Sequence, residues 1–437
     1  MALEDARGLA LSGATPRALE RYEAALAAHL SFRDGAAPLL AQALEEAPAF
    51  AMAQAFAAYL ALGGRDPAGA AEARRVLAHA VRLPMDARAR AHLLAIAALA
   101  AGRHERAEAI YGAILAEHPR DVLALGIAHS CDYLLGETDE LHRRVARVLG
   151  AWHAGVPGYH AVLAMYAFGL EEAGRYARAE AFARRALELE PRDVRAHHAV
   201  AHVYEMRGEA ARGIRWAEER RAYWDDGSAV AVHNWWHVAL FQLALGRRAA
   251  ALAIYDARIR PALGGALSAL IDASALLWRF ELAGEGVGGR WRELAGHWAP
   301  HAEDAYCAFS DLHAMMAFAA AGQRASAAAL LGAQRRRIGQ SGINGAMTRL
   351  VGLPACRALL AFGEERYREA EALLAALPSR AHRLGGSRAQ HGIVARTLAE
   401  AARRQSGGVR PDGRLTRLRI IGSSPGGDRQ WLQPRAC

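Results

Sequence analysis

The sequence contains no lysine, so arginine carries its positive side-chain charge at neutral pH. The formal net charge is +9, but residues 403–437 contribute +6 of it through eight arginines and two aspartates, which leaves +3 for the rest of the chain. That remainder shows no clustered basic face with interleaved aromatic residues, the pattern that binds phosphate backbones. We therefore expect no nucleic-acid partner and interpret the arginines as a compositional bias.

Cysteines and long apolar runs are also scarce. The four cysteines lie far apart without CxxC spacing, which argues against a disulfide framework or a zinc-finger module. No apolar run reaches the length of a bilayer span, and the N-terminal stretch "MALEDARGLALSG" lacks the apolar core of a signal peptide. These absences predict a cytoplasmic protein without a membrane partner.

What the sequence has in abundance is small helix formers. The hydrophobic fraction is 53%, yet only 7% of the residues are aromatic, because alanine and leucine dominate. Such a composition favours an all-α fold. A chain of 437 residues is longer than one compact domain usually is, so it indicates two or three domains or one elongated repeat array.

Glycines recur at a nearly constant interval and indicate a repeat array. Their successive spacings are 38, 34, 38, 34, 38, 38, 38 and 41 residues, and they stand at Gly64, Gly102, Gly136, Gly174, Gly208, Gly246, Gly284, Gly322 and Gly363. This period fits two helices per unit, with the glycine supplying the turn between them.

Two units resemble the tetratricopeptide repeat. In "YAFGLEEAGRYARAEAFARRALELEP" the repeat's offsets are occupied by Gly174, Tyr176, Ala179, Ala186 and Pro191, and "GRHERAEAIYGAILAEHP" repeats the pattern. The predicted fold is an all-α, right-handed α-solenoid of about nine helical hairpins in a single superhelical domain over residues 1–403. The basic segment 404–437, rich in Gly, Pro and Ser, is expected to be a disordered tail.

Unusual polar residues fall on the predicted inner surface. In tetratricopeptide arrays the first helix of each unit lines the concave face through positions two, five, nine and twelve. With the recurring glycine as position fifteen, these positions hold His198, His202, Glu205, His233, Trp236, Ser274 and Trp278, and close to them lie His160, Asn234, His237, Asp311 and His313. Together these are the predicted ligand-binding residues. Because these residues are concentrated in a few neighbouring units, the sequence favours a localized site.

The histidine spacing allows three kinds of chemistry. Imidazoles at i and i+4 chelate one metal ion, and two such pairs that face each other suit zinc, iron or a dinuclear centre. The candidate ligands of this divalent metal are His198, His202, Glu205, His233 and His237. The same side chains serve equally as hydrogen-bonding groups that shape a binding surface. In the third alternative, general acid–base catalysis, His202 or His237 pairs with Glu205 or Asp311.

Several stretches in one order resemble the tetratricopeptide repeat protein 38 family: "MYAFGLEEAGRYARAE", "AHHAVAHVYEMRGE", "VHNWWHVALF", "AIYDARIRP", "GVGGRW" and "FSDLHAMMAF". The resemblance runs to about residue 400. It implies a complete helical superhelix whose family-specific residues coincide with the predicted inner-surface residues, and it implies no particular reaction. We expect a small molecule or short peptide in a concave pocket rich in His and Trp; the alternatives are an enzyme, with or without metal, and an adaptor with protein partners.

Overall fold

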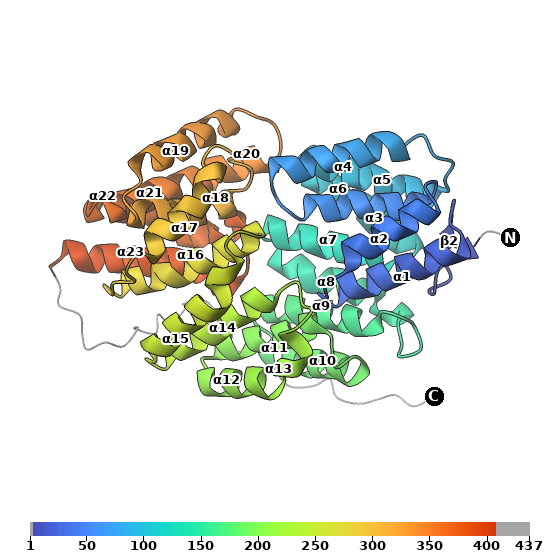
Figure 1. Ribbon diagram of the computed structural model, residues 1–437, viewed down its shortest axis with the longest axis horizontal. Coiled ribbons are helices and arrows are strands. Elements are labelled where there is room, and N and C mark those ends of the chain that lie inside the picture. The colour runs from blue at the N-terminus through green and yellow to red at the C-terminus, as the bar shows by residue number, and fades with distance from the viewer. Residues whose placement is uncertain (1–2, 408–437) are drawn as a thin grey trace.

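The protein is a stack of antiparallel helix pairs, as the computed structural model of residues 3–407 shows (Figure 1). Consecutive helices pack into hairpins, and each hairpin packs on the next along the chain. A single hairpin cannot bury its apolar face alone, so each hairpin packs on its neighbours. Within residues 3–407 the buried hydrophobic side chains form two large clusters, one in the earlier and one in the later units, and three smaller ones. The predicted all-α solenoid is confirmed.

Nine hairpins correspond to the nine predicted units. Their first helices are α3 (Ala51–Leu62), α5 (Ala87–Ala100), α7 (Val122–Leu135), α9 (Tyr159–Glu172), α11 (Val194–Arg207), α14 (Ala231–Ala244), α16 (Leu267–Leu282), α18 (Ala308–Ala320) and α21 (Leu353–Gly363). Their second helices are α4 (Pro67–Ala80), α6 (His104–Glu117), α8 (Thr138–Val148), α10 (Tyr176–Leu189), α12 (Ala210–Glu219), α15 (Arg248–Ile254), α17 (Arg290–Trp298), α19 (Arg324–Ile338) and α22 (Tyr367–Leu374).

The remaining elements precede, link or close this array. A first hairpin, α1 (Pro16–Leu30) and α2 (Ala36–Glu46), follows the short strands β1 (Leu3–Glu4) and β2 (Ala10–Leu11), which pair antiparallel. Linking helices are α13 (Arg221–Trp224), α20 (Ile343–Met347), the 3₁₀ turns η1 (Leu149–Ala151), η3 (Arg260–Ala262), η4 (Ala299–His301) and η6 (Pro378–Leu384), and the π-helical turns η2 (Tyr255–Ile259) and η5 (Thr348–Gly352). The last helix is α23 (Arg388–Gln405).

The recurring glycines occupy the predicted turns in the middle of the array. From Gly102 to Gly322 all seven have a positive φ, between 66° and 75°, the left-handed conformation that ends a helix. At the two outer units the prediction is off by one or two residues. There Arg65, with φ of 53°, and Glu365, with φ of 61°, take the left-handed conformation in place of Gly64 and Gly363.

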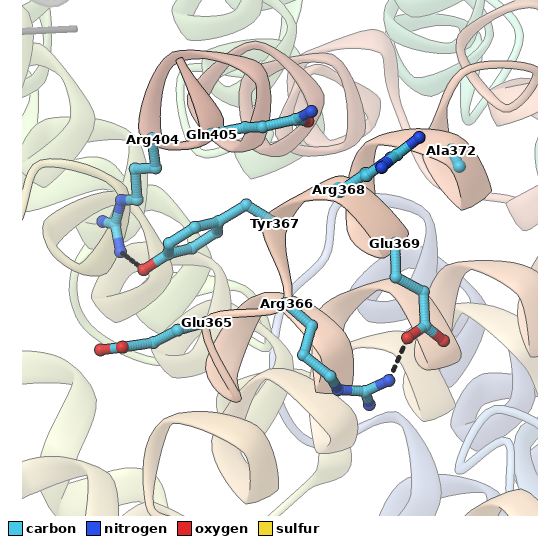
Figure 2. Close-up of a pocket in the computed structure, with 8 residues that line it drawn as sticks. All are labelled: Glu365, Arg366, Tyr367, Arg368, Glu369, Ala372, Arg404 and Gln405. Carbon is cyan, nitrogen blue, oxygen red and sulfur yellow. Dashed lines mark hydrogen bonds and ion pairs between the residues drawn. The ribbon is translucent and has the colours of Figure 1, made fainter. Parts of the chain in front are cut away.

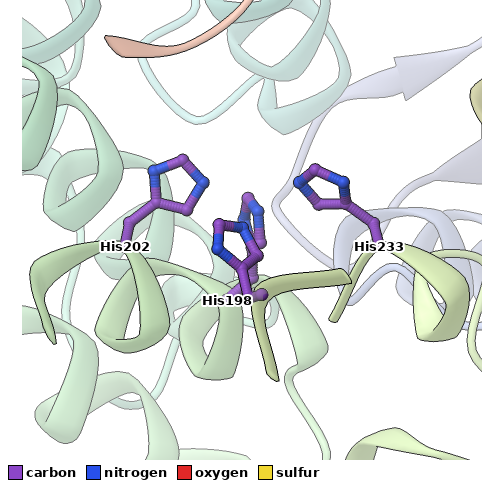
Figure 3. A group of neighbouring side chains, drawn as sticks. His198, His202 and His233 are labelled. Atoms are coloured by element: carbon purple, nitrogen blue, oxygen red, sulfur yellow. The ribbon is translucent and has the colours of Figure 1, made fainter. Parts of the chain in front are cut away.

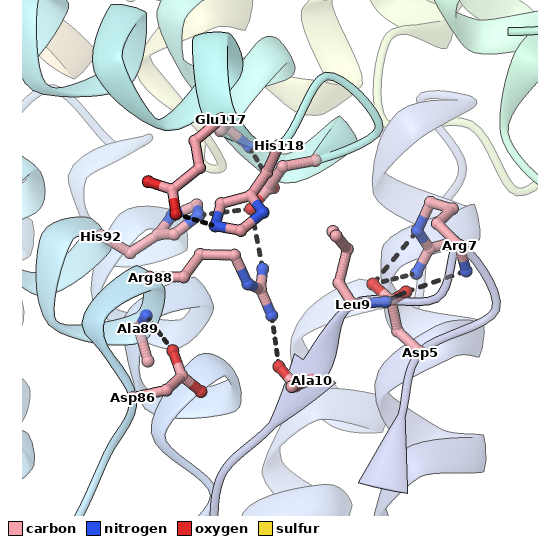
Figure 4. A network of polar contacts seen from close by, with 12 residues as sticks. Asp5, Arg7, Leu9, Ala10, Asp86, Arg88, Ala89, His92, Glu117 and His118 are labelled. Atoms are coloured by element: carbon pink, nitrogen blue, oxygen red, sulfur yellow. Dashed lines mark hydrogen bonds and ion pairs between the residues drawn. The ribbon is translucent and has the colours of Figure 1, made fainter. Parts of the chain in front are cut away.

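A buried ion-pair network ties the first strands to the array (Figure 4). The Arg88 guanidinium donates to Asp121 Oδ2 at 2.7 Å and to the Ala10 carbonyl at 2.8 Å, and His92 Nε2 lies 2.9 Å from the same carboxylate oxygen. Although burial opposes it, these partners hold the pKa of Asp121 well below its usual range. The network fixes the N-terminal end of the solenoid.

Helix α23 lies against the concave side of the solenoid. Its residues bond to first helices of several units: Trp278 Nε1 donates to Thr397 Oγ1 at 3.0 Å, and the Arg388 backbone N–H lies 3.2 Å from both carboxylate oxygens of Glu172. The helix ends at Gln405, so it includes the first two residues of the predicted tail, 404 and 405. The rest of the predicted tail, residues 408–437, lies outside the described residues.

One helical segment, Ile343–Gly363, is long and apolar enough to cross a membrane, contrary to the expectation that no run reaches that length. Buried residues make up 61% of its apolar window. A largely buried core helix can have the same length and apolar composition as a membrane span.

Candidate metal centre

Four histidines from two neighbouring first helices converge in the interior (Figure 3). Helix α11 contributes His198 and His202, and α14 contributes His233 and His237, each pair one helical turn apart. Ring centroids lie 4.4 Å apart for His198 and His202, 4.6 Å for His202 and His237, and 5.0 Å for His198 and His233. One nitrogen of each ring lies within 4.8 Å of the others, so the two HxxxH pairs form one group, which we call the histidine cluster.

Three carboxylates from three helices approach Nδ1 of these histidines. Asp272 Oδ1 lies 2.8 Å from Nδ1 of His233, Glu205 Oε2 lies 2.7 Å from Nδ1 of His237, and Glu171 Oε2 lies 3.3 Å from Nδ1 of His202. Glu171 approaches His202 without forming a hydrogen bond. The carboxylates hydrogen-bonded to Nδ1 of His233 and His237 fix the orientation of these two rings and favour the tautomer that leaves Nε2 free to bind a metal. This is the usual environment of metal-ligating histidines.

The nitrogens that face the cluster have no other partner. Nε2 of His198, His202 and His237 is buried, and none of these atoms has a hydrogen-bond partner among residues 3–407. Buried polar atoms are almost always hydrogen-bonded, because an unpaired one costs free energy. The three orphaned nitrogens therefore indicate a missing central group.

The protonation of the cluster suits a metal ligand. Burial, followed by the charge of the neighbouring histidines, lowers the pKa of His198 and His237 well below the ordinary value. Burial also lowers the pKa of His202 to about 4. His233 differs, since Asp272 raises its pKa although burial opposes the rise. Three of the four rings are thus neutral near pH 7, the form in which imidazole binds a metal ion.

Aromatic and basic side chains back the cluster. The Trp236 ring is fully buried and stacks on His233 at a centroid distance of 5.1 Å, and the Arg279 guanidinium carbon lies 5.2 Å from the Trp236 ring. Asn234 is buried, and both atoms of its amide lack a hydrogen-bond partner within residues 3–407. Because Trp236 is buried and stacks on His233, it packs in the core against the histidine cluster.

Solvent reaches the cluster at one side. The side chains of Glu205 and His233 are 18% and 19% exposed, whereas His202 and His237 are at most 1% exposed. Burial nevertheless raises the pKa of Glu205. Because α23 packs on first helices of several units, the site is a partly open interior position.

Two surface cavities lie away from this site. The larger one, about 670 Å³, is lined by residues of α22 and by the end of α23, with Tyr367 and Arg404 hydrogen-bonded at its edge (Figure 2). The other, about 270 Å³, lies between α19 and α21. Neither is lined by a residue of the histidine cluster.

Five of the predicted site residues are engaged elsewhere. His160 Nδ1 pairs with Asp193, Ser274 Oγ donates to the Leu270 carbonyl, and Trp278 Nε1 donates to Thr397. The predicted pairing of Asp311 with a cluster histidine is not observed, since Asp311 accepts a hydrogen bond from Gln334 at 2.9 Å. His313 Nδ1 lies 2.7 Å from the Phe309 carbonyl oxygen. None of these five contacts the histidine cluster through a described hydrogen bond or ring contact.

Two buried glutamates beside the cluster are absent from the sequence-based prediction. Glu171 and Glu172 end α9, and each is at most 1% exposed. Burial raises the pKa of both carboxyls to about 8. A signal was present, since Glu171 holds position twelve of its unit, the same position as Glu205. Counted from Gly174, it is predicted to face the inner surface.

Comparison with known proteins shows distant similarity only. No family model matches the chain. A solved structure of Naa15/Naa10 bound to HypK-THB is 15% identical, with a TM-score of 0.33, over 91% of this chain and 71% of that chain. The tetratricopeptide domain of P58(IPK) is 16% identical, with a TM-score of 0.22, over 89% of this chain and 98% of that chain. By its own helix pairs and turn glycines, the chain is a tetratricopeptide-like helical repeat protein.

Proposed function

We propose that this protein binds a divalent transition-metal ion through His198, His202, His233 and His237. The observation that carries the proposal is the convergence of four histidine rings, one nitrogen of each within 4.8 Å of the others, together with Nε2 of three of these rings, which is buried without a partner among the described residues. Imidazole suits zinc, iron, copper and nickel, and nitrogen-only ligation disfavours magnesium and calcium. The carboxylates on Nδ1 support the same proposal.

The test is metal analysis of protein purified without a histidine tag. We expect stoichiometric zinc or iron in the wild-type protein, its loss in His198→Ala and His237→Ala, and its retention in His153→Ala, whose histidine is exposed. Apo-protein prepared with a chelator is expected to take up zinc again. Wild-type protein that neither contains metal nor takes up zinc would contradict the proposal.

Metal-dependent catalysis is a second candidate function, favoured by the partial exposure of Glu205 and His233. A catalytic metal site keeps a position open for water or substrate, whereas a structural site is closed. We expect azide to change the visible spectrum of the cobalt-substituted protein, because azide would occupy that open position. An unchanged spectrum at high azide concentration would favour a closed, structural metal site.

The expected small-molecule ligand fits the same opening, and we propose that it binds beside the metal at Glu205 and His233. A peptide along the whole concave face is disfavoured, because α23 already packs there. The resemblance to the tetratricopeptide repeat protein 38 family leads us to propose the same centre for that family. Protein partners on the convex helices would be compatible with this arrangement.

A further inference from the structure

A second group of metal-ligating side chains lies directly beside the histidine cluster. Glu171, Glu172 and His202 each place one nitrogen or oxygen atom within 4.8 Å of the other two. All three side chains are at most 1% exposed. Two adjacent carboxylates in the interior carry a charge that must be neutralised by a cation or by protons.

Several polar atoms of these residues have no hydrogen-bond partner in the described part of the chain. Both carboxylate oxygens of Glu171 and Nδ1 of His202 are buried without a hydrogen-bond partner within residues 3–407, although Nδ1 lies only 3.3 Å from Glu171 Oε2. Glu172 is held in place by the Arg388 backbone N–H. No ion pair from an arginine to either glutamate is found in the described part of the chain.

The two nitrogens of His202 point to two different groups. Nδ1 faces Glu171, so Nε2 is the atom that remains for the histidine cluster. Oxygen and nitrogen ligands of this kind suit zinc, iron or copper, and two carboxylates balance the charge of a divalent ion. The alternative occupant of the space is a proton shared between the two carboxyls.

We propose that Glu171, Glu172 and Nδ1 of His202 hold a second divalent transition-metal ion. His202 then releases its ring N–H proton to solvent and bridges the two metal ions as an imidazolate. This inference rests on the proposed function, because the first ion occupies the histidine cluster. It makes the centre dinuclear, with a nitrogen-rich site near the solvent opening and a carboxylate-rich site deeper in the interior.

Zinc stoichiometry of the full-length, untagged protein tests the inference. We expect two zinc ions per chain in the wild type, one in Glu171→Gln, and two in the control Glu188→Gln, whose carboxylate is exposed on α10. Gln has the shape of Glu without its charge, so Glu171→Gln is expected to fold; far-UV circular dichroism checks this. Glu172→Gln, expected to hold one zinc ion, provides an independent variant.

The outcomes separate the two proposals. One zinc ion in the wild type that persists in Glu171→Gln and is lost in His237→Ala would overturn the second site and keep the histidine centre. No zinc in the wild type would overturn both. One zinc ion that is lost in Glu171→Gln and retained in His237→Ala would overturn the histidine centre, and with it the dinuclear arrangement.

Copper substitution tests the sharing of His202. Two copper(II) ions bridged by one imidazolate interact magnetically, so the electron paramagnetic resonance spectrum of the wild type loaded with two Cu²⁺ is expected to show a spin–spin signal. The Glu171→Gln protein is expected to show the spectrum of an isolated Cu²⁺ ion instead. Two bound Cu²⁺ ions without any interaction would overturn the shared ligand.

Discussion

Single residues set the orientation of the histidine cluster. Asp272 and Glu205 bond Nδ1 of His233 and His237 at 2.8 and 2.7 Å, and this determines which nitrogen of each ring faces inward. Neither carboxylate is next to its histidine in sequence, since Asp272 comes from α16 and Glu205 from α11. The site is therefore specified by side-chain pairs that span neighbouring units.

Removing one orienting carboxylate should weaken metal binding without removing a ligand. Asp272→Asn is expected to lower zinc affinity by roughly 10- to 100-fold, because His233 loses the partner that fixes its tautomer. Competition with a chromophoric chelator measures the affinity. A zinc affinity within two-fold of the wild type would show that Asp272 does not position His233. The control is Asp304→Asn, which removes the carboxylate partner of His301 at a more exposed site.

Asp311 should make stability depend on pH in a predictable direction. Burial raises its pKa in the folded protein to about 7, whereas an unfolded aspartate titrates near 3.9. Below pH 4 the Asp311 carboxyl is protonated in both the folded and the unfolded protein. Between pH 4 and 7 it loses its proton only in the unfolded protein, so the free energy of unfolding decreases as the pH rises. Above pH 7 the carboxyl is ionised in both states, and the decrease levels off.

The variant Asp311→Asn removes that titration while it keeps an oxygen that can accept from Gln334. Its stability relative to the wild type is therefore expected to rise from pH 4 to pH 7, by on the order of 3 kcal/mol, and then to stay constant. Urea denaturation at a series of pH values measures the difference. A difference that does not vary with pH would show that Asp311 is ionised in the folded protein.

At the scale of elements, α23 determines whether the inner face is open. Its start is fixed by a capping box between Ser387 and Gln390 and by the Tyr133 hydroxyl, which donates to Gln390 Oε1 at 3.0 Å. In the same first turn of α23, the Ala389 carbonyl accepts a hydrogen bond from the Arg279 guanidinium at 3.3 Å. The helix thus bridges the early and the late units of the array.

Loss of the cap should loosen α23 and speed metal release. Ser387→Ala is expected to cost about 1 kcal/mol and to increase amide hydrogen exchange in α23. A chelator should then remove zinc several-fold faster than from the wild type. The control is Thr15→Ala, which removes the comparable N-cap of α1, far along the chain from the histidine cluster, and should leave the rate of zinc release unchanged. Equal release rates in Ser387→Ala and the wild type would contradict the covering role of α23.

At the scale of the whole molecule, the ends of the solenoid meet. The Ile343 backbone N–H donates to the Gly102 carbonyl at 3.0 Å, and Arg383 lies 3.5 Å from Glu137. In Figure 1 the last units, in orange, accordingly lie beside the first, in blue. The array is closed by contacts between residues more than 200 positions apart, beyond the nearest-neighbour packing of an open solenoid.

Two glycines with the same left-handed conformation, Gly136 and Gly246, separate the cost of backbone strain in a turn from the cost of breaking a contact between distant units. A Cβ at Gly136 would lie 2.1 Å from the His382 carbonyl oxygen, whereas a Cβ at Gly246 meets nothing within 4 Å. Both have a positive φ, so alanine costs roughly 1 to 2 kcal/mol at either position.

Gly136→Ala should therefore lower the melting temperature more than Gly246→Ala, because it also displaces η6 from the end of α7. Thermal denaturation followed by circular dichroism compares the two. Equal decreases in melting temperature would show that the contact with η6 contributes nothing to stability.

The sequence alone was sufficient for the repeat, the helix pairs and the two HxxxH faces, because these follow from local spacing: a glycine ends each first helix, and residues four apart share one face. Local spacing also contained the signal for Glu171, which holds position twelve of its unit, although the sequence-based prediction left it out. It could not indicate that α23 returns to the concave side, nor that Asp272 orients His233 while Asp311 turns to Gln334. Those pairings depend on how distant units stack, so only the tertiary structure decided that the predicted histidines line a partly enclosed centre.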